Sequence, residues 1–223
     1  MHTNIDSAVY DITVASDENT PYHHYFNGPH SIPGAHCPNC DRPLLCFLTL
    51  DTRDPRLCMM DMPFSALPLL YCWTCTISFE EFYYRLNADG GGVTLLKYGN
   101  GIDANRNFAP DEVPLYFPLS PVELIKMTDE QVAFMDRLRN GETVFAAGDW
   151  VDTPTHQLGG LPHLCQGWDD PMFICPMCGK EMPFLAAITD QVFPADIFES
   201  ALIDIVYSYC ADCHVVGAIH QCD

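Results

Sequence analysis

Eight of the twelve cysteines stand in C-x-x-C pairs, which carry the strongest chemical signal in this chain. The pairs are Cys37/Cys40, Cys72/Cys75, Cys175/Cys178 and Cys210/Cys213. A tight C-x-x-C turn presents two sulfurs on one side, and four thiolates from two such turns satisfy a tetrahedral Zn²⁺ completely. We therefore expect two zinc ions, each bound by four cysteines.

The spacing of the pairs is itself repeated. A gap of 31 residues separates the two pairs of each set, and the second set lies 138 residues after the first. The same offset relates Pro38 to Pro176 and Tyr71 to Tyr209. Two copies are too few for a solenoid. The repeat predicts a pseudo-symmetric pair of zinc-ribbon-like modules.

A closed shell of four thiolates bears on catalysis, because catalytic zinc keeps an open position for water. We therefore interpret both sites as structural. The segment Cys72-Trp73-Thr74-Cys75 has the look of a thioredoxin-type redox motif, but such a motif needs a helix directly after it. Residues 76–79 read as a strand instead. Thiol redox chemistry stays as an alternative.

Other candidate ligands lack the repeat. The unpaired cysteines are interpreted as ordinary thiols; they are Cys46, Cys58, Cys165 and Cys222. His36 and His214 adjoin ligands but neither is duplicated, so we do not expect them to bind metal. A polar stretch holds three more histidines, which we interpret as solvated rather than metal-binding: His23, His24 and His30.

Runs of β-branched and aromatic residues between turn residues predict strands. The expected strands are 44–50, 67–71 and 77–86 in the first module, 182–188, 202–209 and 215–219 in the second, and 8–14 before both. The glycines at 90–92 predict a hairpin that returns as a strand over 93–98. Gly179 suits the exit of its knuckle, where a positive φ is needed.

The segment between the modules predicts a loop with a short strand around Tyr116, followed by a helix over 129–140. Thr128 and Gln131 match a capping box, and Gly141 can end the helix. The fold class is therefore α+β, mainly β. The expected divisions are residues 1–98, 99–150 and 151–223, joined in one globular body.

The second half resembles a known family. The segment Gly159-Gly160-Leu161-Pro162, with Gln166, precedes C-P-x-C-G-x-x-M-x-F-L at 175–185. This combination, over residues 157–213 and more faintly 30–75, resembles the YwqG-like bacterial family of unknown function. It is also similar to the programmed-cell-death-2 proteins of eukaryotes. That resemblance implies binding and escort of a basic ribosomal protein. The glycines themselves predict a tight turn with positive φ.

The charge excludes two classes of partner. Ten Lys and Arg stand against 30 Asp and Glu, which gives a net charge of −20. Nucleic acid and anionic membranes both require clustered cations, so neither is expected as a partner. No apolar run is long enough for a transmembrane helix, and residues 1–6 do not resemble a signal peptide, so we expect a cytoplasmic location.

A broad negative field steers a basic protein into fast encounter. The main functional hypothesis is a non-enzymatic module that binds and sequesters a basic protein, either as a chaperone-like escort or by neutralising a toxin. One alternative is an enzyme that uses thiol redox chemistry or an unrecognised pocket. Another is a structural or regulatory module that has no basic partner. The oligomeric state does not follow from the sequence.

Overall fold

The fold is described from a computed structural model of the 223-residue chain. It describes residues 8–15, 20–60, 62–75, 81–88, 91–99, 113–142, 154–162, 173–189 and 203–222. Part of the predicted strand over 77–86 and of the turn at 89–92 falls outside these ranges, as does Cys165.

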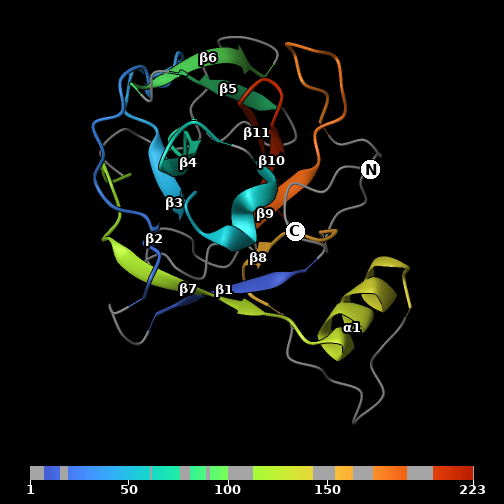
Figure 1. The fold of residues 1–223 in the computed structure, drawn as a ribbon. Coiled ribbons are helices and arrows are strands. Elements are labelled where there is room, and N and C mark those ends of the chain that lie inside the picture. The colour runs from blue at the N-terminus through green and yellow to red at the C-terminus, as the bar shows by residue number, and fades with distance from the viewer. Residues whose placement is uncertain are drawn as a thin grey trace.

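The described residues form one curled antiparallel sheet of eleven strands and one α-helix (Figure 1). The strands are β1 (Tyr10–Val14), β2 (His24–Phe26), β3 (Leu45–Asp51), β4 (Ala66–Tyr71), β5 (Phe82–Leu86), β6 (Val93–Tyr98), β7 (Ser120–Lys126), β8 (Gln157–Leu158), β9 (Phe184–Thr189), β10 (Ile203–Cys210) and β11 (Val215–Cys222). Their order is β4-β3-β2-β7-β1-β8-β9-β10-β11-β5-β6. The mainly β prediction is confirmed, and strands from all three expected divisions share this sheet.

The main core lies on the inner face of the curled sheet. Side chains alternate along the strands, so Ile12, Phe26, Leu48 and Ile188 point inward and are almost completely buried. A 3-10 turn, η1 (Pro55–Met60), connects β3 to β4, and Leu57 packs against the same core. Burial of this apolar surface is the main favourable contribution to folding.

The two ends of the sheet meet through one tyrosine. The Tyr84 hydroxyl on β5 accepts a hydrogen bond from the Leu70 amide (2.9 Å) and donates one to the Pro68 carbonyl (2.7 Å), both on β4. These groups lie on the β4 edge that no strand pairs within the described residues. Pro68 has no N–H, which hinders pairing of this edge with a further strand. Burial raises the pKa of Tyr84 well above its usual range.

We expect Tyr84→Phe to lower the free energy of unfolding by about 1–3 kcal/mol, because it leaves a buried N–H and a buried C=O without this partner. Denaturant unfolding measures the loss. Tyr116→Phe is the control, since Tyr116 is 53% exposed. Equal stability of the two variants would contradict the role given to the Tyr84 hydroxyl.

The β3–β4 and β9–β10 pairings coincide at the offset of 138 residues. The pairs Cys46↔Leu70 and Leu48↔Leu69 recur as Phe184↔Ser208 and Ala186↔Tyr207. Three further pairs recur in the same way: Thr49↔Pro68, Leu50↔Leu67 and Asp51↔Ala66 become Ala187↔Val206, Ile188↔Ile205 and Thr189↔Asp204. The irregularity in register falls at the same place in both hairpins. The repeat therefore extends from the cysteines into the strand registers.

A buried histidine stands at the same place beside each hairpin. The Nδ1 of His24 accepts from the Asp51 amide, and the Nδ1 of His156 accepts from the Thr189 amide, both at 3.1 Å. Asp51 and Thr189 are 138 residues apart, but the two histidines are 132 apart. This shift hides the correspondence from a search at a single offset. The prediction that His24 belongs to a solvated segment is wrong, because His24 is 2% exposed within β2.

Burial lowers the pKa of His156 from its ordinary value of 6.5 to about 4. A histidine whose folded pKa is depressed contributes stability above pH 6.5, and that stability is lost as the pH falls from 6.5 towards 4. The loss reaches about 1.4 kcal/mol per pH unit for a fully shifted group. We expect His156→Gln, which keeps an acceptor for the Thr189 amide, to flatten the pH dependence of unfolding between about pH 7 and 5 in excess zinc. Parallel curves for parent and variant would disprove this.

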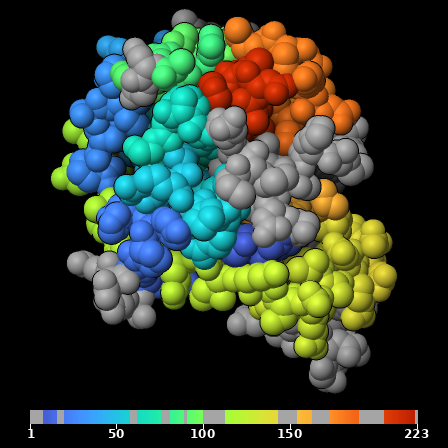
Figure 2. Space-filling model, in the orientation of Figure 1, coloured from blue at the N-terminus to red at the C-terminus, as the bar shows by residue number. Residues whose placement is uncertain are grey.

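The helix prediction is confirmed by α1 (Asp129–Arg139). Thr128 caps it, Gln131 completes the capping box, and Gly141 follows with φ 73°. The apolar side of α1 contacts a small separate cluster with Val9 and Met127, rather than the main core. Figures 1 and 2 show α1 beside the ends of β1 and β7, as a projection at the lower right.

The predicted strand around Tyr116 is wrong. Residues 113–119 are not strand, and β7 begins at Ser120. The prolines of this segment suggest a loop, yet Pro121 is accepted within β7 opposite Tyr25 of β2. No helix among the described residues is long and apolar enough to cross a membrane.

Candidate metal centres

The structure brings the eight paired cysteines together in two groups, as their spacing predicts. The first group is Cys37, Cys40, Cys72 and Cys75, and the second is Cys175, Cys178, Cys210 and Cys213. Within each group all four sulfurs lie within 4.8 Å of one another. All eight are free thiols rather than disulfides. Each group could hold one metal ion.

The sulfur separations fit a tetrahedral metal site. The Sγ atoms of Cys37 and Cys75 lie 3.8 Å apart, those of Cys40 and Cys72 3.7 Å, and those of Cys178 and Cys210 3.8 Å. A regular tetrahedron with metal–sulfur bonds of about 2.3 Å places its sulfurs about 3.8 Å apart. A disulfide would require about 2.05 Å. Four sulfur donors in this arrangement are typical of zinc or iron.

The first knuckle of each group is built by the same four backbone interactions. Cys37 donates to the Arg42 carbonyl and Cys175 to the Lys180 carbonyl, both at 2.8 Å. The other three correspondences are Asp41 N–Cys37 O with Gly179 N–Cys175 O, Leu44 N–Ala35 O with Met182 N–Phe173 O, and the bridges His36↔Pro43 with Ile174↔Glu181. Each corresponding pair of residues is 138 positions apart. The two turns therefore hold their sulfurs in the same local frame.

Each of these knuckles ends on a residue with positive φ. Gly179 has φ 71°, as the sequence predicts, and Asp41 has φ 60° at the equivalent place. Asp is among the few residues other than glycine that adopt this conformation as single residues. The knuckle therefore does not require glycine at its exit.

The first site is the more deeply buried of the two. Cys37, Cys72 and Cys75 are buried, and Cys40 is half-buried. Hydrogen bonding to Cys37 and Cys75, together with burial, raises the pKa of Cys72. A hydrogen bond from Cys72 lowers the pKa of Cys75 to about 4, and the Asn39 amide also donates to Cys75 Sγ at 3.3 Å. A cation is the remaining requirement for all four sulfurs to ionise together.

The two cations expected to offset thiolate charge have other partners. Arg42 donates to the Val113 carbonyl at 2.5 Å, which ties the first knuckle to the segment before β7. Lys180 pairs with Asp212 at 2.6 Å, and both are exposed. Asp212 chiefly raises the pKa of Lys180, and Cys178 and Cys210 add to that. Only Lys180 therefore contributes charge near its sulfurs.

The second site is more open to solvent, since Cys178 is exposed and Cys213 half-buried. We therefore expect a chelator to remove metal from the second site first. Timed alkylation read by mass spectrometry should label Cys178 and Cys213 before Cys37 and Cys72. Labelling of both groups at one rate would contradict a difference that rests on burial.

The remaining candidates lie outside the two groups. Cys46 is buried, burial raises its pKa to about 11, and its sulfur contacts Thr49 Oγ1. His214 Nδ1 contacts the Tyr209 hydroxyl at 2.9 Å, and neither His214 nor His36 joins a metal group. The side chains of Cys58 and Cys222 lie outside the description. Residues 73–75 form a turn in which Cys75 belongs to the metal group, and residues 76–80 are not described.

Sequence reasoning missed a buried charged cluster beside the first hairpin. Because His24 Nδ1 accepts from a backbone amide, its Nε2 carries the proton and donates to Asp54 at 2.9 Å. Arg56 binds the same carboxylate at 2.5 Å and donates to the Leu124 carbonyl on β7. Asp54 has no exposed surface. The run Asp51–Arg56 carries two acids and two arginines, which is its only sequence signal.

Comparisons with known proteins give no relative. No family model matches the chain, and no curated protein or solved structure shows significant similarity to it.

Proposed function

We propose that this chain is a non-enzymatic, cytoplasmic interaction module, stabilised by two zinc ions, that binds and sequesters a basic protein partner. The observation that carries the proposal is the distribution of charge. Nine of the ten basic residues lie in the described part of the chain, since Arg106 falls outside it. Six of these nine are paired with carboxylates. Each pair is neutral, so the net charge of −20 rests on the other groups.

The metal sites support a structural role for the cysteines. Four sulfurs close a tetrahedral shell and leave no position for water or substrate. With zinc bound, each centre would carry a formal charge of about −2 and would increase the acidity. Zinc is the metal we assign, because it binds four thiolates without redox chemistry of its own.

The strand pairings support an internal duplication. We assign β4-β3-β2-β7 and β1-β8-β9-β10 to two halves related by a pseudo-twofold axis through the pair Thr13↔Glu123. The pairs Ile12↔Leu124 and Val14↔Val122 lie on either side of this centre. The resemblance to the YwqG-like and programmed-cell-death-2 families favours protein binding by such a scaffold.

A salt-dependent capture experiment tests the function. The chain, loaded with zinc and immobilised, is exposed to lysate of its source cells at low salt and then washed at about 0.5 M salt, where charge interactions are strongly screened. An unrelated protein of similar net charge is the control. We expect basic proteins that the control does not retain and that salt releases. Capture of nothing beyond the control, or of a partner indifferent to salt, would favour a structural or regulatory module instead.

A further inference from the structure

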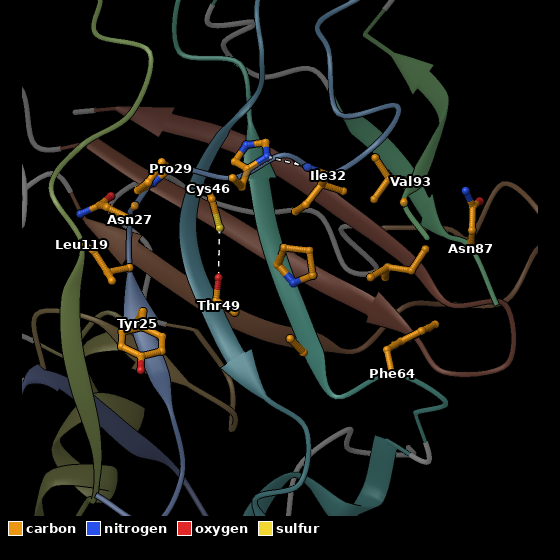
Figure 3. Close-up of a pocket in the computed structure, with 16 residues that line it drawn as sticks. Tyr25, Asn27, Pro29, Ile32, Cys46, Thr49, Phe64, Asn87, Val93 and Leu119 are labelled. Atoms are coloured by element: carbon orange, nitrogen blue, oxygen red, sulfur yellow. Dashed lines mark hydrogen bonds between the residues drawn. The ribbon is translucent and has the colours of Figure 1, made fainter. Parts of the chain in front are cut away.

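A groove of about 240 Å³ opens on the face of β2, β3 and β4 opposite the main core (Figure 3). Its floor is a cross-strand row in which Tyr25 pairs with Thr49 and Thr49 with Pro68. Cys46 extends the floor, and Leu119 and Val93 stand at its two sides. The lining is mostly apolar, with a few polar groups at its edge, as is typical of ligand sites.

The second half fills the equivalent face with its own rings. By the shared registers, Phe184 and Val206 occupy the places of Cys46 and Pro68. Both are buried in a separate cluster with Phe173 and Tyr83. Phe173 in turn occupies the place of Ala35, because the hydrogen bonds to their carbonyls correspond. The first half therefore has Cys and Ala where the second has two phenylalanines.

The walls of the groove are held in place before anything binds. Leu119 lies over Gly28 (φ 100°), so closely that a Cβ at Gly28 would stand 2.4 Å from Leu119 Cδ1. His30 accepts from the Ile32 amide through Nδ1 and donates from Nε2 to the Leu44 carbonyl at 2.6 Å. These contacts fix the loop after β2. A preformed groove loses little free energy to ordering when it binds.

We infer that this groove binds one aromatic side chain of the partner, presented on a segment with flanking Lys or Arg. An aromatic ring supplies the apolar surface that Phe184 supplies in the second half, and aromatic anchors commonly dominate binding energy at interfaces. The flanking cations follow from the net charge of −20. Leu115 and Tyr116, exposed on the segment that leads to Leu119, offer further apolar contact. The inference rests on the proposed function and names the binding surface it needs.

Fluorescence anisotropy with synthetic peptides tests the groove. The probes are a short labelled peptide with one central Phe between lysines, its Phe→Ala version, and a Phe peptide with Ser in place of Lys. We expect the Phe–Lys peptide to bind about 10- to 100-fold more tightly than the Ala version, since burying a ring contributes that much. We also expect it to bind more tightly than the Ser version at low salt. Equal affinities of the Phe and Ala peptides would overturn the groove.

Matched variants place the binding on the chain. Leu119→Ser should weaken binding of the Phe–Lys peptide at least tenfold, whereas Leu161→Ser, which alters a side chain of similar exposure (59% against 54%), should not. Cys46→Phe introduces the ring of the second half and should also abolish the preference for Phe over Ala. Circular dichroism checks that each variant is folded, and Leu119→Ser stays informative if Cys46→Phe is not. Equal effects of the two Leu→Ser changes would overturn the assignment.

The outcomes separate this inference from the function it rests on. Salt-sensitive binding of the Lys peptides with no preference for Phe keeps the basic partner and overturns the groove. A preference for Phe without any preference for Lys over Ser overturns the basic character of the ligand. Dissociation of a dimer by Leu119→Ser in sedimentation experiments would make a second copy of the chain the occupant, and that also overturns the inference.

Discussion

Replacing Cys72 with serine should abolish the cooperative fold of this protein. Cys72 is 4% exposed, follows β4 directly and belongs to the group that joins the knuckle before β3 to the end of β4. Loss of one thiolate weakens a site whose metal binding is worth about 10–16 kcal/mol in small zinc domains. That exceeds the whole stability of a typical domain, about 5–15 kcal/mol. Far-ultraviolet circular dichroism and the emission of Trp73, which is buried beside Cys72, measure the change.

Two controls accompany Cys72→Ser. Cys46→Ala removes a buried thiol outside the metal groups, so this variant should keep its fold and its metal. Cys178→Ser alters the exposed site and should lose metal with a smaller loss of stability. A folded Cys72→Ser protein with unchanged metal content would show that the first group is not a structural metal site.

Replacing Asp54 with alanine should lower the free energy of unfolding by roughly 3–5 kcal/mol, the usual result of removing one partner of a buried ion pair. Asp54 accepts from both His24 and Arg56, and Arg56 also holds the Leu124 carbonyl, so one carboxylate connects β2, η1 and β7. The hydrogen bonds from Arg56 and His24 lower the pKa of Asp54 despite its burial. Because a depressed carboxylate stabilises only above its unfolded pKa of 3.8, this contribution is lost as the pH falls below that value. Denaturant titration at neutral pH measures the effect.

Arg53→Ala is the matched control for Asp54→Ala. Arg53 also pairs with an acid two residues away, but its side chain is 65% exposed, so its removal should cost no more than about 1 kcal/mol. Similar losses for the two variants would mean that the buried cluster has no special importance. Asp54→Asn, which keeps the shape of the side chain, should fall between them.

Much of the fold follows from local sequence signals. Strong apolar runs predicted β3, β4, β9, β10 and β11, and the capping box predicted α1, because these signals lie within a few neighbouring residues. Strands β2, β7 and β8 were missed for physical reasons. β2 and β8 are only three and two residues long, and β7 contains Pro121. Their pairing depends on neighbours distant in the chain, which no local pattern records.

The metal groups and the groove differ in the same respect. The C-x-x-C spacing predicts both cysteine clusters, because each pair is local and the 31-residue gap matches one hairpin. The groove could not be predicted, since Tyr25, Cys46, Pro68, Val93 and Leu119 come from separate segments. Its emptiness becomes informative only beside Phe184, after the strand registers show which residues correspond.

The central claim is that eight cysteines form two closed structural metal sites. Elemental analysis of natively purified protein, combined with thiol titration before and after chelation, tests it most directly. We expect two equivalents of zinc per chain, and eight thiols that become reactive only when the metal is removed. Well under two equivalents of bound metal, or rapid reaction of the paired cysteines before chelation, would contradict the account.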